Sequence, residues 1–131
     1  MTPEAASRAC LMAGFWVPLA LCTWLAFTPS PPEAVFRVSD LLLHAFAFAY
    51  LSFSLSLAHH LSAVRVALWM LGYGVLIEVL QGLIPERTPE FKDLLVDGAG
   101  IAVGLAAARL LGAWSRRTLT RVLGGVLPAV R

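Results

Sequence analysis

Long apolar stretches alternate with short polar breaks along the whole chain. The apolar stretches cover residues 9–27, 41–58, 64–84 and 94–114. As helices rising 1.5 Å per residue they are about 27 to 32 Å long, which matches the hydrocarbon thickness of a bilayer. The breaks separate four helices, because the proline-rich segments at 28–32 and 85–89 cannot continue a helix and the connection at 59–62 is short enough for a tight hairpin.

This pattern predicts an all-α fold, an integral membrane bundle of four transmembrane helices. One domain is expected over residues 1–131, which is the length of a single domain. The helices are expected at about residues 9–27, 39–60, 63–84 and 91–114. They are followed by a basic tail, residues 115–131, whose apolar positions share one helical stripe. The tail fits either a short interfacial helix or a disordered segment.

The composition points to a lipid environment. Hydrophobic residues make up 59% of the chain and charged residues 14%, and the mean hydropathy is +0.78. This is too few charged residues to cover the surface of a small soluble domain in water. Membrane lipids are therefore the expected surroundings. The formal net charge of +2 is too small for a nucleic-acid footprint, and no nucleic-acid partner is expected.

The positions of lysine and arginine predict the orientation. With the N-terminus inside, the inner side holds six basic residues: Arg8, Arg65, Arg116, Arg117, Arg121 and Arg131. The outer side holds Arg37, Arg87 and Lys92. This excess places both termini in the cytoplasm.

Polar residues inside the spans form three pairs, each about one helical turn apart. The pairs are Asp40 and His44 at the start of the second helix, Glu78 and Gln81 near the end of the third, and Asp93 and Asp97 at the start of the fourth. Because consecutive helices run in opposite directions, all three pairs are expected at one depth near the outer interface. Arg87 and Lys92 in the loop above are cations that can neutralise two of the carboxylates.

Ionisable residues in a membrane are candidates for function, because a charge near the bilayer centre costs about 2.5 to 3.5 kcal/mol. We therefore interpret the set as one outward-facing polar cavity, formed by Asp40, His44, Glu78, Gln81, Arg87, Asp93 and Asp97. It could bind a metal through mixed nitrogen and oxygen ligands, although no HExxH or CxxC signature is present and no metal is assigned. Glu78 or His44 could act as acid or base. Arg87 and Lys92 could hold an anionic head group. A structural network that holds the helices together is the remaining interpretation.

Small residues predict close helix packing. Gly100 and Gly104 form a GxxxG motif in an alanine-rich part of the fourth helix, and they fit either a contact within the bundle or a homodimer. Gly72 and Gly74 are expected to let a neighbour approach the third helix.

The polar motifs together resemble the VanZ-like family of small integral membrane proteins. The resemblance is carried, in order, by Ser39-Asp40-x3-His44, Ile77-Glu78-x2-Gln81, Pro85-x-Arg87 and Asp93-Leu94-Leu95-x-Asp97-x2-Gly100. The founding type of the family is linked to low-level resistance to teicoplanin, a lipoglycopeptide that acts on cell-wall precursors. Leu41 stands where a lysine is often found in the family, and Asp97 stands where asparagine is common, which adds one potential charge to the cavity.

The leading hypothesis is a protein of the bacterial cytoplasmic (inner) membrane whose polar cavity binds an amphipathic envelope ligand. That ligand is a lipid-linked precursor or the lipid-tailed glycopeptide itself, and its binding lowers glycopeptide susceptibility. The alternative is a membrane enzyme that acts on a lipid head group by acid–base or metal-assisted chemistry. A third alternative is a structural subunit whose polar cluster only specifies helix packing. The sequence assigns no cofactor and does not decide whether a reaction is catalysed.

Overall fold

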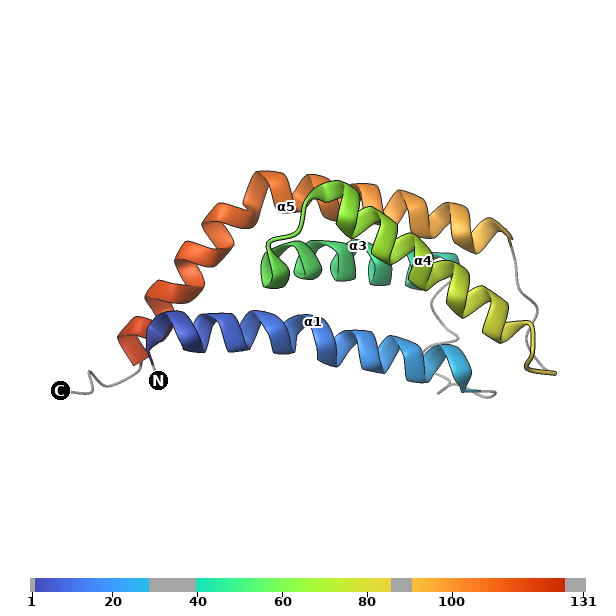
Figure 1. Ribbon diagram of the computed structural model, residues 1–131, viewed down its shortest axis with the longest axis horizontal. Coiled ribbons are helices and arrows are strands. Elements are labelled where there is room, and N and C mark those ends of the chain that lie inside the picture. Colours follow the sequence, from blue (N-terminus) through green and yellow to red (C-terminus); the bar gives the residue numbers. More distant parts are fainter. Residues whose placement is uncertain (1, 29–39, 86–90, 127–131) are drawn as a thin grey trace.

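Four helices build the structure, a computed structural model that describes residues 2–28, 40–85 and 91–126. They are α1 (Pro3–Phe27), α3 (Asp40–His59), α4 (Ala63–Gln81) and α5 (Phe91–Val126). Each is long and apolar enough to cross a membrane, which confirms the predicted all-α bundle of four spans. In Figure 1 the helices run roughly along the long axis, and successive ones point in opposite directions.

The start of α1 and the end of α4 differ from the predicted bounds, and capping residues explain both differences. The first helix begins at Pro3, six residues earlier than expected, because the Thr2 side chain accepts a hydrogen bond from the Ala5 N–H and caps it. The third span ends at Gln81, three residues early. There Gly82 forms the cap, and Pro85 disfavours helical backbone in the residue before it.

The predicted hairpin between the second and third spans is present and tight. His60 adopts a left-handed conformation with φ of 51°. The Ser62 side chain then caps α4 by accepting a hydrogen bond from the Arg65 N–H. These two residues reverse the chain within the few positions between α3 and α4.

Helices α3 and α5 approach each other closely through the GxxxG motif. A Cβ atom added to Gly100 would lie 2.6 Å from the Ala45 carbonyl oxygen, and one added to Gly104 would collide with the Ala49 carbonyl. The motif therefore serves the bundle within one chain, and α3 covers the face that a homodimer through these glycines would need. Gly74 also lies against a neighbour, as expected, whereas nothing lies within 4 Å of a Cβ added to Gly72.

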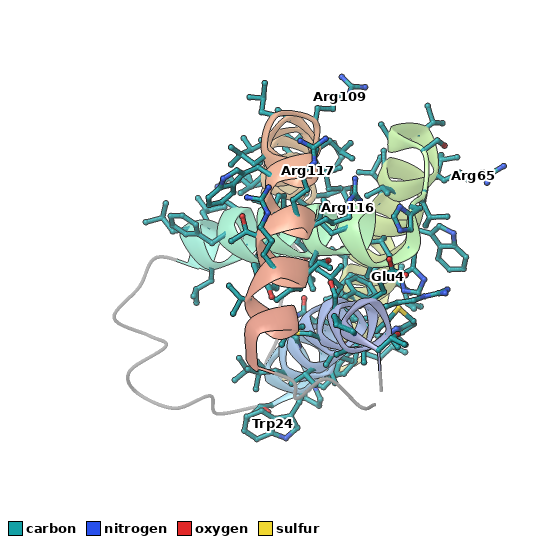
Figure 2. The ribbon with its side chains drawn as sticks, turned by 90° about the vertical axis from the view of Figure 1, so that its left-hand side faces the viewer. Glu4, Trp24, Arg65, Arg109, Arg116 and Arg117 are labelled. Carbon is teal, nitrogen blue, oxygen red and sulfur yellow. The ribbon has the colours of Figure 1, made fainter. Side chains whose placement is uncertain are left out.

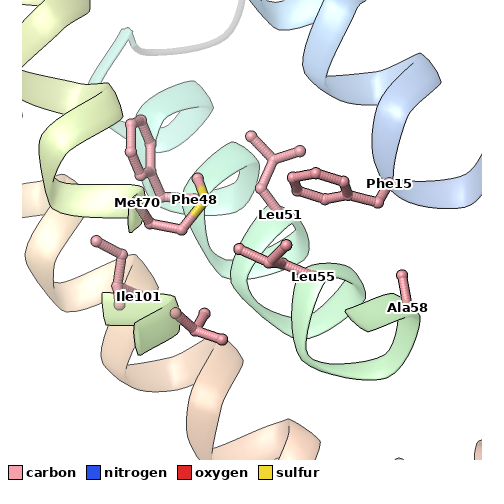
Figure 3. Close-up of a cluster of buried hydrophobic side chains, with 8 residues drawn as sticks. Phe15, Phe48, Leu51, Leu55, Ala58, Met70 and Ile101 are labelled. Atoms are coloured by element: carbon pink, nitrogen blue, oxygen red, sulfur yellow. The ribbon is translucent and has the colours of Figure 1, made fainter. Parts of the chain in front are cut away.

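An apolar core joins the four helices, while the outward faces are also apolar. Figure 3 shows Phe15 of α1, Leu51 of α3, Met70 of α4 and Ile101 of α5 packed together. Large hydrophobic side chains such as Phe46, Trp69 and Leu110 are 70% or more exposed. Apolar residues on both the inside and the outside are expected of a bundle in lipid.

The basic tail belongs to α5 as far as Val126. Up to that residue it is therefore neither a separate interfacial helix nor disordered. Figure 1 shows its last part turning across the end of the bundle towards the start of α1. The Thr120 hydroxyl donates a hydrogen bond to Ser7 Oγ at 3.4 Å, and Ser7 is buried. Figure 2 looks onto this end, around which Arg65, Arg116 and Arg117 are labelled.

Candidate functional site

The first turns of α3 and α5 and the last turn of α4 lie at the same end of the bundle, opposite the chain termini (Figure 1). This follows from the antiparallel order of the helices, which returns each polar pair to the same level. The expected convergence is therefore realised for His44, Glu78, Asp93 and Asp97. We call these four residues the polar cluster.

A hydrogen-bonded pair of His44 and Asp97 lies at the centre of the polar cluster. His44 Nδ1 lies 2.8 Å from Asp97 Oδ1, and the Asp97 side chain is only 1% exposed. The His44 ring also stacks on Phe48, with a ring-centroid distance of 6.3 Å and an angle of 7° between planes. The imidazole is thus held by a carboxylate at one nitrogen and by an aromatic face.

Gly74 makes this arrangement possible. A Cβ added there would lie 2.9 Å from Asp97 Oδ2 and 3.3 Å from the Phe48 ring. Any larger residue would require the Asp97 carboxylate and the Phe48 ring to shift from these positions. Gly74 precedes Glu78 by four residues, so the same helix face supplies the close approach and the carboxylate.

Glu78 and Asp93 complete the cluster next to His44. One ligand atom from each of these three side chains lies within 4.8 Å of the others. Asp93 is buried, at 8% exposure, and Glu78 and His44 are half-buried. The arrangement brings an oriented imidazole and two carboxylates from three helices together, which can accept protons, bind a cation or hold a hydrogen-bonding ligand.

Gln81 does not join the polar cluster through its hydrogen bond. Its Nε2 donates to the Ala26 carbonyl oxygen at 3.0 Å. That carbonyl belongs to the last turn of α1, where helix oxygens have no partner within the helix. Gln81 thus caps α1 from α4, a role that spacing along one helix could not reveal.

The remaining expected site residues lie at or beyond the edge of the described chain. Asp40 is the first residue of α3, and its side chain lies outside the described part. Arg87 also lies outside it. Lys92 is exposed in the first turn of α5.

An apolar cavity of about 700 Å³ lies between α1, the end of α3 and α4. Its lining includes Phe15, Trp16, Leu68, Trp69, Tyr73 and Leu76. Tyr73 connects this cavity to the polar cluster, because its ring lies 5.8 Å from that of Phe48, on which His44 stacks. Its hydroxyl pairs with Thr23 of α1 at 3.0 Å. Spacing along the sequence does not predict this cavity, because its walls come from helices far apart in the chain.

The family model described as VanZ/LLP1 matches residues 15–112, about three quarters of the chain. The chain belongs to the VanZ/LLP1 family. The matched part contains the whole polar cluster and the close contact of α3 with α5. VanZ family membership is associated with glycopeptide resistance. No curated protein and no solved structure matches the chain.

Proposed function

We propose that this VanZ-like protein binds an amphipathic envelope ligand, a lipid-linked cell-wall precursor or the lipid tail of a glycopeptide, and thereby lowers glycopeptide susceptibility. The observation that carries the proposal is the meeting of polar groups from three helices at one end of an otherwise apolar bundle. The polar cluster would receive the polar part of the ligand.

The apolar part of such a ligand has a matching surface nearby. The cavity between α1, the end of α3 and α4 is lined almost entirely by aliphatic and aromatic side chains. Phe48 and Tyr73 connect it to the polar cluster. Ligand sites of this kind combine apolar walls with a few placed polar groups.

Binding is tested with the purified full chain in detergent or lipid nanodiscs. Teicoplanin, which carries a lipid tail, is compared with a glycopeptide of the same class that lacks the tail. The proposal predicts that the tailed compound binds at least tenfold more tightly. Equal affinity for both compounds, or no binding of either, contradicts binding of the glycopeptide tail.

The contribution of the apolar cavity is tested by filling it. Leu76→Trp adds volume to the cavity wall and should weaken binding of the tailed compound. Val79→Trp is the matched control, because Val79 is exposed on the same helix and does not line the cavity. If both variants bind like the parent, the tail lies elsewhere.

A membrane enzyme acting on a lipid head group is the second candidate. It is favoured by the His44–Asp97 pair, since a buried carboxylate that orients an imidazole is a recurrent arrangement of general bases. Glu78→Gln separates the two candidates, because it preserves shape and removes the titrating carboxylate. A binding protein should tolerate this isosteric change better than a catalyst, which should lose turnover by about 100-fold or more.

A further inference from the structure

Three side chains of the polar cluster have the composition and spacing of a metal-ligand set. His44 of α3, Glu78 of α4 and Asp93 of α5 each offer one ligand atom, and these atoms lie within 4.8 Å of one another. Ligands 2.0 to 2.2 Å from a tetrahedral zinc ion lie about 3.5 Å apart. Side-chain rotations that move the atoms by about 1 Å are therefore enough to close the set around an ion.

Asp97 stands where a supporting carboxylate of a metal-bound histidine is usually found. Histidine ligands commonly donate their second ring N–H to a carboxylate, which fixes the tautomer and makes the other nitrogen a better ligand. Here Asp97 Oδ1 lies 2.8 Å from His44 Nδ1, so a bond from His44 to a metal ion would be made by Nε2. Asp97 is also almost fully buried, so its position is held by the packing of α4 and α5.

The charge of the cluster favours a divalent cation. Glu78, Asp93 and Asp97 bring three carboxylates to one end of an apolar bundle, where burial of charge is costly. A divalent ion offsets two of these charges at the point where the three helices meet. It also connects α3, α4 and α5 by direct bonds.

We propose that His44, Glu78 and Asp93 bind a zinc ion, with Asp97 as the residue that positions the imidazole. An imidazole with two carboxylates suits Zn²⁺, whereas Mg²⁺ and Ca²⁺ prefer oxygen ligands alone. Three protein ligands leave a fourth position for water or a ligand group. The site lies within the polar cluster of the proposed function but does not depend on an amphipathic ligand, so zinc binding is measured without one.

The test uses the full chain without a histidine tag, stripped with a chelator and then equilibrated with Zn²⁺ alone. Bound metal is measured by mass spectrometry. The parent should retain one zinc ion per chain, and His44→Ala and Glu78→Gln should fall to background. Asp97→Asn should weaken binding by about 10- to 100-fold, because it acts only on the orientation of the ligand.

His60→Asn is the matched control. His60 is exposed at the opposite end of α3 with φ of 51°, a conformation that asparagine tolerates. This variant should bind zinc like the parent. Circular dichroism and gel filtration identify variants that fail to fold. If His44→Ala does not fold, zinc binding by Glu78→Gln, which conserves the shape of the side chain, tests the site instead.

Substitution with Co²⁺ separates the proposed ligands from the two cysteines. Ligation by nitrogen and oxygen produces d–d bands without the strong charge-transfer absorption of a thiolate. A thiolate band, a parent that retains no zinc, or cluster variants that bind zinc as tightly as the parent would each overturn the proposal. Failure of zinc binding with intact teicoplanin binding would overturn the metal site alone.

Discussion

At the scale of single residues, a tyrosine of α3 compensates for the hydrogen bond that a proline removes from α1. Pro18 lies inside α1 and has no N–H, so the Gly14 carbonyl lacks its usual donor within the helix. The Tyr50 hydroxyl of α3 donates to this carbonyl at 2.7 Å. In a membrane such freed backbone groups are satisfied by neighbouring helices, and here that bond also ties α1 to α3.

The Tyr50 bond should depend on Pro18. Tyr50→Phe is expected to destabilise the protein by about 0.6 to 1.7 kcal/mol, the range of hydrogen bonds between membrane helices. In a Pro18→Ala background the same change should cost less, because the substituted residue regains a backbone N–H that then donates to the Gly14 carbonyl. Unfolding of the four variants in mixed detergent micelles provides the coupling energy. A cost that is the same in both backgrounds would show that the hydroxyl acts elsewhere.

At the scale of helices, α5 is the element whose packing decides most of the fold. Gly100 and Gly104 bring its first half against the α3 backbone. Its last part contacts the start of α1 through Thr120 and Ser7. One continuous helix thus connects the end that carries the polar cluster to the end that carries the chain termini.

Substitutions of the α5 glycines should have opposite effects according to the face they occupy. Gly104→Ala places a methyl group against the Ala49 carbonyl, and overpacking of this kind costs about 1 to 3 kcal/mol. Gly98→Ala is the control on the same helix, since nothing lies within 4 Å of the added Cβ. It should be neutral or stabilising by up to about 1 kcal/mol, because alanine favours helix. Thermal unfolding in detergent measures both.

The contact between the ends of α5 and α1 is testable by crosslinking. In a chain with Cys10 and Cys22 replaced by serine, the pair Ser7→Cys and Thr120→Cys should form a disulfide on mild oxidation, because the two hydroxyl oxygens lie 3.4 Å apart. Thr118→Cys paired with Ser7→Cys is the control, two residues away on another face of the helix. Cleavage at a protease site introduced between residues 86 and 90 then shows whether the fragments stay joined. If the fragments separate for both cysteine pairs, the end of α5 does not dock on the start of α1.

At the scale of the whole molecule, the two ends of the bundle differ in chemistry. One end carries the polar cluster, and the other carries the start of α1, the last part of α5 and several arginines (Figure 2). We propose that the arginine-rich end faces the cytoplasm, in line with the excess of basic residues in cytoplasmic loops. The polar cluster then faces the outside, where envelope ligands are accessible.

This orientation predicts the behaviour of reporter fusions in bacteria. A fluorescent protein, which matures only in the cytoplasm, should fluoresce at either terminus. Alkaline phosphatase, which is active only outside, should be active when inserted after Pro85 and inactive when fused after residue 131. Phosphatase activity at the C-terminus would reverse the orientation and move the polar cluster to the cytoplasmic side.

The four spans and the four residues of the polar cluster follow from the amino-acid pattern alone. Hydropathy and length predict each span, since lipid requires a continuous apolar helix of a set length. Helical spacing and the alternating direction of the spans were enough to bring His44, Glu78, Asp93 and Asp97 to one level. These features depend on local pattern and on the geometry of the bilayer.

Which residues touch across the bundle depends instead on tertiary packing. Gln81 shares a turn with Glu78, yet it caps α1 because the Ala26 carbonyl lies beside it in space. Likewise, an isolated GxxxG motif fits any close neighbour, and the neighbour proved to be α3. The end of α5 is helical where it docks on α1, although its sequence also fitted disorder. In each case the deciding partner lies far away in the chain, and helical periodicity records the face of a residue without identifying what packs against it.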